Sequence, residues 1–74
     1  MFEKVAEIIA DQLGIDVSEI TMESNLTEDL KADSIDIIAL IMELETEYHI
    51  EVGDDELMKL HTVKDIVEFL ETKK

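Results

Sequence analysis

Apolar residues recur at helical spacing near the start of the 74-residue chain. Phe2, Val5, Ile9 and Leu13 follow one another at steps of three and four residues, which places them on one stripe of an amphipathic helix. Gly14 comes directly after this stripe, in the position where glycine commonly ends a helix. We therefore predict a helix over residues 2–13.

A long connection without helical periodicity follows, over residues 15–33. Connections of this length inside a compact domain are uncommon and often functional. We expect short helical turns near 17–20 and 27–30, which would be held to the core by the isolated aliphatic side chains of the segment. These side chains are Ile15, Val17, Ile20, Leu26 and Leu30.

Three further helices are predicted, over about 34–48, over 54–60 after Gly53, and from Thr62 onward. Thr62 and Asp65 have the spacing of a capping box, with Asp in place of the usual Glu or Gln. An apolar stripe at i, i+3, i+4 and i+7 follows in the last helix, and no segment is typical of a strand. The predicted fold is an all-α bundle of three main helices and one short helix, forming a single domain over residues 1–74.

The helix over 34–48 has an apolar arc that is too broad for one buried face. One side of the arc is a typical core stripe, whereas Ile35, Ile38 and Met42 lie on the other side of Ser34. Either the helix packs on two sides, or this second stripe is an exposed docking surface. Both can hold if Ile38 is buried while Ile35 and Met42 are exposed. The core stripe consists of Ile37, Leu40, Ile41, Leu44 and Tyr48.

The start of this helix offers two candidate N-caps, Asp33 and Ser34. With Asp33 as the cap, the third helical residue is Asp36, whose carboxylate can reach back to complete a capping box. With Ser34 as the cap, that residue is Ile37, which cannot. We therefore expect Asp33 to cap the helix and the Ser34 hydroxyl to remain free. A hydroxyl there is well placed to carry a phosphate, because helix N-termini favour anions.

Composition excludes several classes of function. Six lysines, no arginine and twenty acidic residues give a net charge of −14, which argues against binding nucleic acid or an anionic membrane. The chain has no cysteine and two histidines, so it lacks a thiol nucleophile and an ordinary zinc site. His49 lies about four turns beyond Ser34, so no nucleophile–base pair is evident. We expect a soluble, cytoplasmic, monomeric protein without catalytic or metal-binding residues or a membrane span.

The sequence Leu-Lys-Ala-Asp-Ser-Ile-Asp at residues 30–36 resembles the motif of the acyl carrier proteins, in which Asp-Ser-Leu opens an acidic helix. The similarity extends to the helix ending in Leu-Gly, the long connection, and the Thr-Val that begins the last helix. The resemblance implies that a phosphopantetheinyl transferase moves 4′-phosphopantetheine from coenzyme A to Ser34 with Mg²⁺. The thiol of that group would then hold an acyl chain as a thioester.

The resemblance also implies two sets of binding residues. Acyl-chain synthases and acyltransferases would dock basic patches on the acidic helix, and the acyl chain would lie between the helices. The implied docking residues are Asp33, Ile35, Asp36, Met42, Glu45 and Glu47. The implied lining of the acyl pocket is Leu26, Ile38, Leu44, Val52, Leu57, Leu60 and Val67.

The chain departs from the usual pattern of these carriers at several positions. Lys31 stands where glycine often precedes Ala-Asp-Ser, and Ile35 replaces the common leucine. These departures leave open a specialised carrier of an aminoacyl or polyketide cargo, although the strong negative charge favours fatty-acyl work. An acidic interaction bundle that binds divalent cations weakly near Asp29, Asp33 and Asp36 is a further alternative. Other departures occur at Ala39, Thr46, His49 and Gly53.

Overall fold

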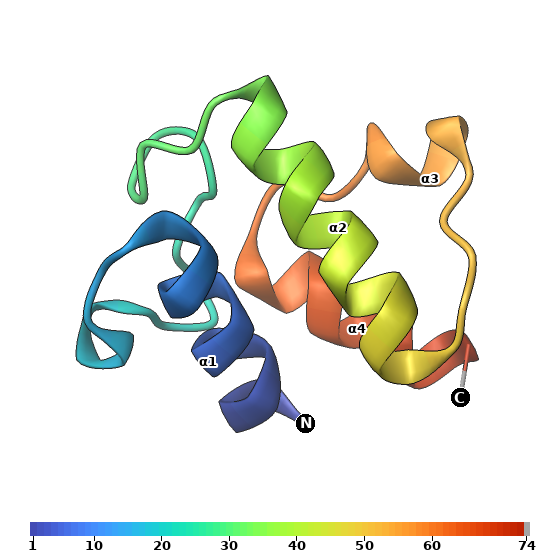
Figure 1. Cartoon of the computed structure of the whole chain (residues 1–74), viewed down its shortest axis with the longest axis horizontal. Helices are drawn as coiled ribbons and strands as arrows, with labels where there is room; N and C mark the ends of the chain where they lie inside the picture. The colour runs from blue at the N-terminus through green and yellow to red at the C-terminus, as the bar shows by residue number, and fades with distance from the viewer. Residues whose placement is uncertain (74) are drawn as a thin grey trace.

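The computed structural model describes residues 1–73 and is entirely helical apart from turns and one isolated bridge between Asn25 and Thr62. The predicted all-α bundle with three main helices and one short helix is confirmed over these residues. Figure 1 shows α2 crossing in front of α4, with α1 on one side and α3 on the other. The elements are α1 (Phe2–Leu13), the 3₁₀ turn η1 (Val17–Glu19), α2 (Ser34–Tyr48), α3 (Asp54–Leu57) and α4 (Val63–Lys73).

Helix α1 follows the predicted apolar stripe and ends at Gly14. Val5 and Ile9 are fully buried, and Gly14 adopts the left-handed conformation with φ 69°. The backbone N–H groups of Gly14 and Ile15 both donate to the carbonyl of Ala10, which closes the last turn. A side chain at position 14 would make this conformation unfavourable by roughly 1–2 kcal/mol, which explains the glycine.

Polar side chains order the connection between α1 and α2. Asp16 Oδ1 accepts a hydrogen bond from Ser18 N at 3.0 Å, and Glu19 Oε2 accepts one from Asp16 N at 3.2 Å, so η1 is capped at its start. The turn predicted at 17–20 is therefore present. At 27–30 the chain forms a hydrogen-bonded turn but no helix, because the left-handed conformation of Lys31 (φ 62°) ends it.

Ile20 and Leu26 anchor this connection, as predicted, since both side chains are buried. The prediction that Val17 is a further anchor is wrong, because its side chain is 44% exposed. Ile15 and Ile20 already pack against the core on either side of η1, so Val17 remains at the surface.

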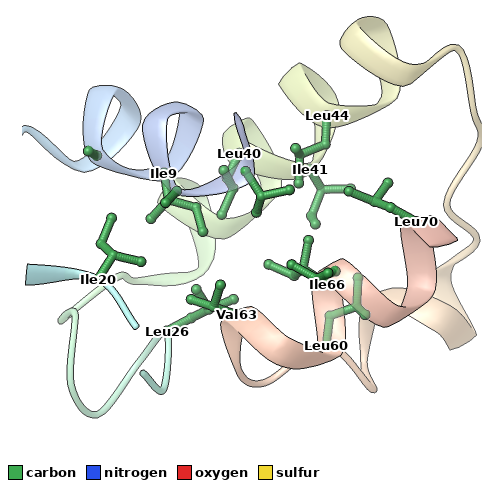
Figure 2. Packing of buried hydrophobic residues seen from close by; sticks show 14 residues of the cluster. Ile9, Ile20, Leu26, Leu40, Ile41, Leu44, Leu60, Val63, Ile66 and Leu70 are labelled. Carbon is green, nitrogen blue, oxygen red and sulfur yellow. The ribbon is translucent and has the colours of Figure 1, made fainter. Parts of the chain in front are cut away.

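The core is aliphatic and is shared by all three main helices. Figure 2 shows Ile9 of α1, Leu40 of α2 and Ile66 of α4 converging on one centre, with Leu26 entering from the connection. Each fully buried side chain of this size contributes about 1.5–3 kcal/mol. The predicted stripe of α4 is confirmed, because Val63, Ile66, Val67 and Leu70 are all buried.

Helix α3 is shorter than predicted and is tied to its neighbours by Glu56. After Leu57 the chain tightens into i→i+3 hydrogen bonds, and Leu60, which was expected to lie within the helix, is buried beyond its end. Glu56 Oε1 accepts a hydrogen bond from Gly53 N at 3.1 Å, while its Oε2 lies 3.3 Å from Lys73 Nζ of α4. The Gly53 hydrogen bond, and then Lys73, hold the pKa of Glu56 below its usual value.

The start of α4 has the predicted capping box and is also bonded to the long connection. Thr62 Oγ1 accepts a hydrogen bond from Asp65 N, and Asp65 Oδ2 accepts one from Thr62 N, both at 3.1 Å. The first N–H groups of the helix, from Val63 and Lys64, donate to carbonyls of residues 24 and 22. Within residues 1–73, none of the helices combines the length and the apolar character needed to cross a membrane.

We predict that Asp65→Asn destabilises the fold by about 1 kcal/mol at neutral pH, the usual magnitude for loss of a helix cap. Partial burial raises the pKa of Asp65, but hydrogen bonds from the His61 and Thr62 backbone outweigh it and hold this pKa below its usual value. A carboxyl group whose pKa is lowered by folding stabilises the folded state at pH values above the pKa that it has in the unfolded chain. This stabilisation is lost as the pH falls through the lower pKa of the folded state.

The difference in the free energy of unfolding between wild type and Asp65→Asn, measured with urea, should therefore be largest at pH 7. It should decrease below about pH 4. Glu68→Gln is the control, because it changes the same charge at an exposed position of α4. Equal losses in the two variants would contradict a specific role for the cap.

Candidate functional site

The candidate site is the beginning of α2, where Asp33 caps the helix as predicted. Asp33 Oδ1 accepts a hydrogen bond from Asp36 N at 2.9 Å, and Asp36 Oδ2 accepts one from Asp33 N at 3.3 Å. This reciprocal capping box makes Ser34 the first residue of the helix. The choice of Asp33 over Ser34 as the cap is thus confirmed.

The Ser34 side chain is exposed, and its hydroxyl has no hydrogen-bond partner within residues 1–73. In the same part of the chain, the backbone N–H groups of Ser34 and Ile35 are also without a partner. Together with the dipole of a 15-residue helix, these donors favour an anion at this point. The arrangement therefore fits a phosphate carried on the Ser34 oxygen.

The Ser34 hydroxyl is not hydrogen-bonded to any base within residues 1–73. His49 lies at the other end of α2, about 22 Å away at 1.5 Å per residue. The Asp33 and Asp36 carboxylates already accept hydrogen bonds from the backbone. This arrangement differs from that of a hydrolase serine, whose hydroxyl is hydrogen-bonded to a base.

The backbone just before Ser34 is held in an unusual conformation. Lys31 has φ 62°, and directly after it the buried Ala32 donates its N–H to the Leu26 carbonyl at 2.9 Å. The left-handed conformation costs a residue with a side chain roughly 1–2 kcal/mol. This conformation explains why glycine is common at the position in the sequences that the chain resembles.

The second apolar stripe of α2 is an exposed surface. The exposed fractions are 76% for Ile35, 50% for Ile38 and 60% for Met42, and Met58 after α3 is also exposed. Ile35 and Met42 are exposed, as the docking interpretation expected, whereas Ile38, which was expected to be buried, is half exposed. Helix α2 contributes Leu40, Ile41 and Leu44 to the core, and Ile38, on the other side of the helix, is only half covered.

The acidic residues implied as docking residues do not form one group. Asp33 and Asp36 lie at the site, but Glu45 Oε2 accepts a hydrogen bond from Val52 N at 2.8 Å and so closes the loop after α2. Glu47 Oε2 lies 3.7 Å from Lys4 Nζ and therefore faces α1. Sequence reasoning missed the structural role of Glu45, since nothing in the local pattern indicates its partner seven residues away.

The residues predicted to line an acyl pocket are mostly part of the closed core. Leu26, Leu44, Leu60 and Val67 are buried, and Val52 and Leu57 pack against the same cluster. Two open surface hollows, of about 460 and 360 Å³, run along α1 and include none of the seven predicted residues. In residues 1–73, no group of three or more His, Cys, Asp or Glu side chains is arranged to hold a metal ion.

Comparisons with known proteins agree on one family. The sequence pattern of the phosphopantetheine attachment site matches residues 3–70. The acyl carrier protein of Clostridium acetobutylicum is 56% identical over 70 residues, which cover 95% of this chain and 91% of that protein.

Two solved structures have the same fold. The acyl carrier protein of Enterococcus faecalis is 33% identical with a TM-score of 0.83, and the match covers 99% of this chain and 92% of that one. A protein of Anaplasma phagocytophilum assigned as an acyl carrier protein is 30% identical with a TM-score of 0.89, over 99% and 86% of the two chains.

We predict that Lys31→Gly stabilises the protein, because glycine adopts the left-handed conformation without a steric penalty. The gain of roughly 1–2 kcal/mol is reduced by about 0.4–1 kcal/mol, since glycine makes the unfolded chain more flexible. A net gain of about 1 kcal/mol should raise the melting temperature by about 4–8 °C.

Lys31→Ala is the matched control, because it removes the same charge but keeps a side chain in the left-handed conformation. It should leave the melting temperature unchanged or lower it. An equal increase for the alanine and glycine variants would show that the conformation of residue 31 is not the cause.

Proposed function

The chain belongs to the acyl carrier protein family, and on that premise we propose that it carries growing or finished fatty-acyl chains as thioesters on 4′-phosphopantetheine attached to Ser34. The observation that carries this proposal is the exposed, unbonded Ser34 hydroxyl at the start of α2, within the matched residues 3–70. The chain would act in the cytoplasm as a single-domain monomer that shuttles its cargo between enzymes.

The residues around Ser34 have distinct roles in this proposal. The Asp33–Asp36 capping box holds the first turn rigid, so the Ser34 oxygen is presented at a fixed point. The Ser34 and Ile35 N–H groups, which have no backbone partner within residues 1–73, would favour the negative charge of the phosphate. With both neighbouring carboxylates engaged in the capping box, the Ser34 proton would be removed by the phosphopantetheinyl transferase. When attached, the group supplies the thiol that this cysteine-free chain lacks.

The exposed stripe of Ile35, Ile38 and Met42 supports a docking role for α2. An apolar centre beside carboxylates is the usual composition of a protein interface. The net charge of −14 would steer basic patches of the transferase, synthases and acyltransferases toward the chain and allow fast, reversible contact. Asp33 and Asp36 are the carboxylates best placed to contact a basic partner. Glu45 and Glu47 would contact it through the carboxylate oxygen that is not already bonded to Val52 N or paired with Lys4.

The acyl chain would enter the aliphatic core by separating α3 from its neighbours. Helix α3 contains no buried residue and is one turn long, so moving it breaks few apolar contacts. The core behind it is free of fully buried aromatic side chains and can rearrange around a flexible chain. The proposed lining remains Leu26, Ile38, Leu44, Val52, Leu57, Leu60 and Val67, with Ile38 turning inward from its exposed position.

The attachment is tested by intact mass after incubation with coenzyme A, Mg²⁺ and a broad-specificity phosphopantetheinyl transferase. We expect wild type to gain the mass of one phosphopantetheine and Ser34→Ala to gain none. Ser18→Ala is the control, because Ser18 is also exposed and follows an aspartate cap. A folded wild type that stays unmodified while a known carrier reacts in the same mixture would refute the proposal.

The docking surface is tested by Met42→Ser, which changes an exposed residue two turns away from Ser34. We expect kcat/KM of the transferase for this variant to fall about 5- to 10-fold through KM, as for loss of an interface residue worth 1 kcal/mol or more. Val17→Ser is the control, since Val17 is exposed outside α2. Equal kinetics for the two variants, with melting temperatures unchanged, would argue against the α2 stripe.

A further inference from the structure

Lys31 is the only cationic side chain between Lys4 and Lys59, and it lies three residues before Ser34. It is exposed and forms no ion pair with any other residue in the range 1–73. By contrast, Lys4 and Lys73 each pair with a glutamate of another helix. The positive charge closest to Ser34 along the chain thus has no ion-pair partner within residues 1–73.

The backbone holds Lys31 at this point although its conformation is unfavourable. A left-handed φ of 62° is unusual for a residue with a side chain, and such conformations tend to persist at functional sites. Ala32 is buried and bonded to Leu26, so the backbone from Lys31 to the start of α2 is fixed. The root of the lysine side chain therefore has a constant position relative to Ser34.

A phosphodiester on Ser34 would be repelled by the negative charges around it, and the positive charge of Lys31 can offset part of this repulsion. It would add a negative charge beside the Asp33 and Asp36 carboxylates, in a chain that already carries −14. The Cα atoms of residues 31 and 34 can be at most about 11 Å apart, because each residue spans at most ~3.6 Å. A lysine ammonium on its flexible four-carbon stem can cover that gap toward a group that projects from Ser34.

We propose that Lys31 is a positioning residue for the prosthetic group, and that its ammonium pairs with the phosphodiester on Ser34. This inference rests on the proposed attachment at Ser34 and adds a role that a glycine at position 31 could not provide. The pairing holds the base of the phosphopantetheine arm against the first turn of α2. Figure 1 shows this end of α2 on the opposite side of the molecule from the start of α1 and the end of α4.

The test is the ³¹P NMR resonance of the phosphodiester in the modified protein, measured at low salt and again at about 1 M salt. At about 1 M the Debye length is only about 3 Å, so exposed charge pairs are largely screened. We expect Lys31→Gln to shift the ³¹P resonance at low salt, Lys31→Arg to restore it close to wild type, and the differences to shrink at high salt.

Lys64→Gln is the matched control, since Lys64 is also exposed but lies in α4. It should leave the ³¹P resonance in place. Lys31→Gly provides a second variant without the charge, one that relieves the backbone strain and so remains folded, and it should reproduce the shift seen for Lys31→Gln.

Modified proteins whose ³¹P resonance is the same for wild type, Lys31→Gln and Lys31→Gly would overturn the role of Lys31 and leave the attachment at Ser34 intact. Failure of wild type to gain mass in the transferase reaction is a separate result, and it would overturn both proposals. The α2 amide resonances confirm in each variant that the first turn is still formed.

Discussion

Leu26 makes the contacts that fix where α2 begins. Its N–H donates to the His61 carbonyl just before α4, and its carbonyl accepts from Ala32 N just before the Asp33 cap, both at 2.9 Å. Its side chain is fully buried among the three main helices (Figure 2). Because one residue joins the start of α4 to the start of α2, the long connection positions Ser34 without being a helix itself.

The core of the protein stabilises the fold, whereas its negative charge destabilises it. The two ion pairs found within residues 1–73, Lys4–Glu47 and Lys73–Glu56, are both exposed, and pairs of this kind contribute at most about 1 kcal/mol each. Stability therefore depends on the aliphatic core, which has to outweigh the repulsion among the surplus carboxylates. The same surplus is what would attract basic partners, so the property that weakens the fold supports the proposed function.

Helix α2 has one side that forms part of the core and another side that faces solvent. Leu40 and Leu44 are fully buried and hold it in the bundle, while Ile35, next to Ser34, and Met42, two turns further on, face solvent. A rigid, well-packed helix can present an exposed apolar stripe without losing its own structure. The capping box at its start adds that rigidity at the residue that would carry the prosthetic group.

The local pattern of side chains is enough to predict the features that depend on interactions within about four residues. The extents of α1 and α2, the Gly14 terminus, and the caps at Asp33 and Thr62 all follow from side chains that lie close along the chain. For the same reason, the identification of Ser34 as an exposed hydroxyl at the start of a helix was possible without coordinates.

Which apolar residues become buried depends instead on contacts between segments that are distant along the chain. Ile20 is buried and Val17 is not, and Ile38 remains half exposed although its sequence context resembles that of the buried stripe. Glu45 closes a loop seven residues away, and Lys31 adopts a left-handed conformation because the buried Ala32 is bonded to Leu26. These outcomes depend on contacts between distant segments, and the local pattern of a sequence does not specify such contacts.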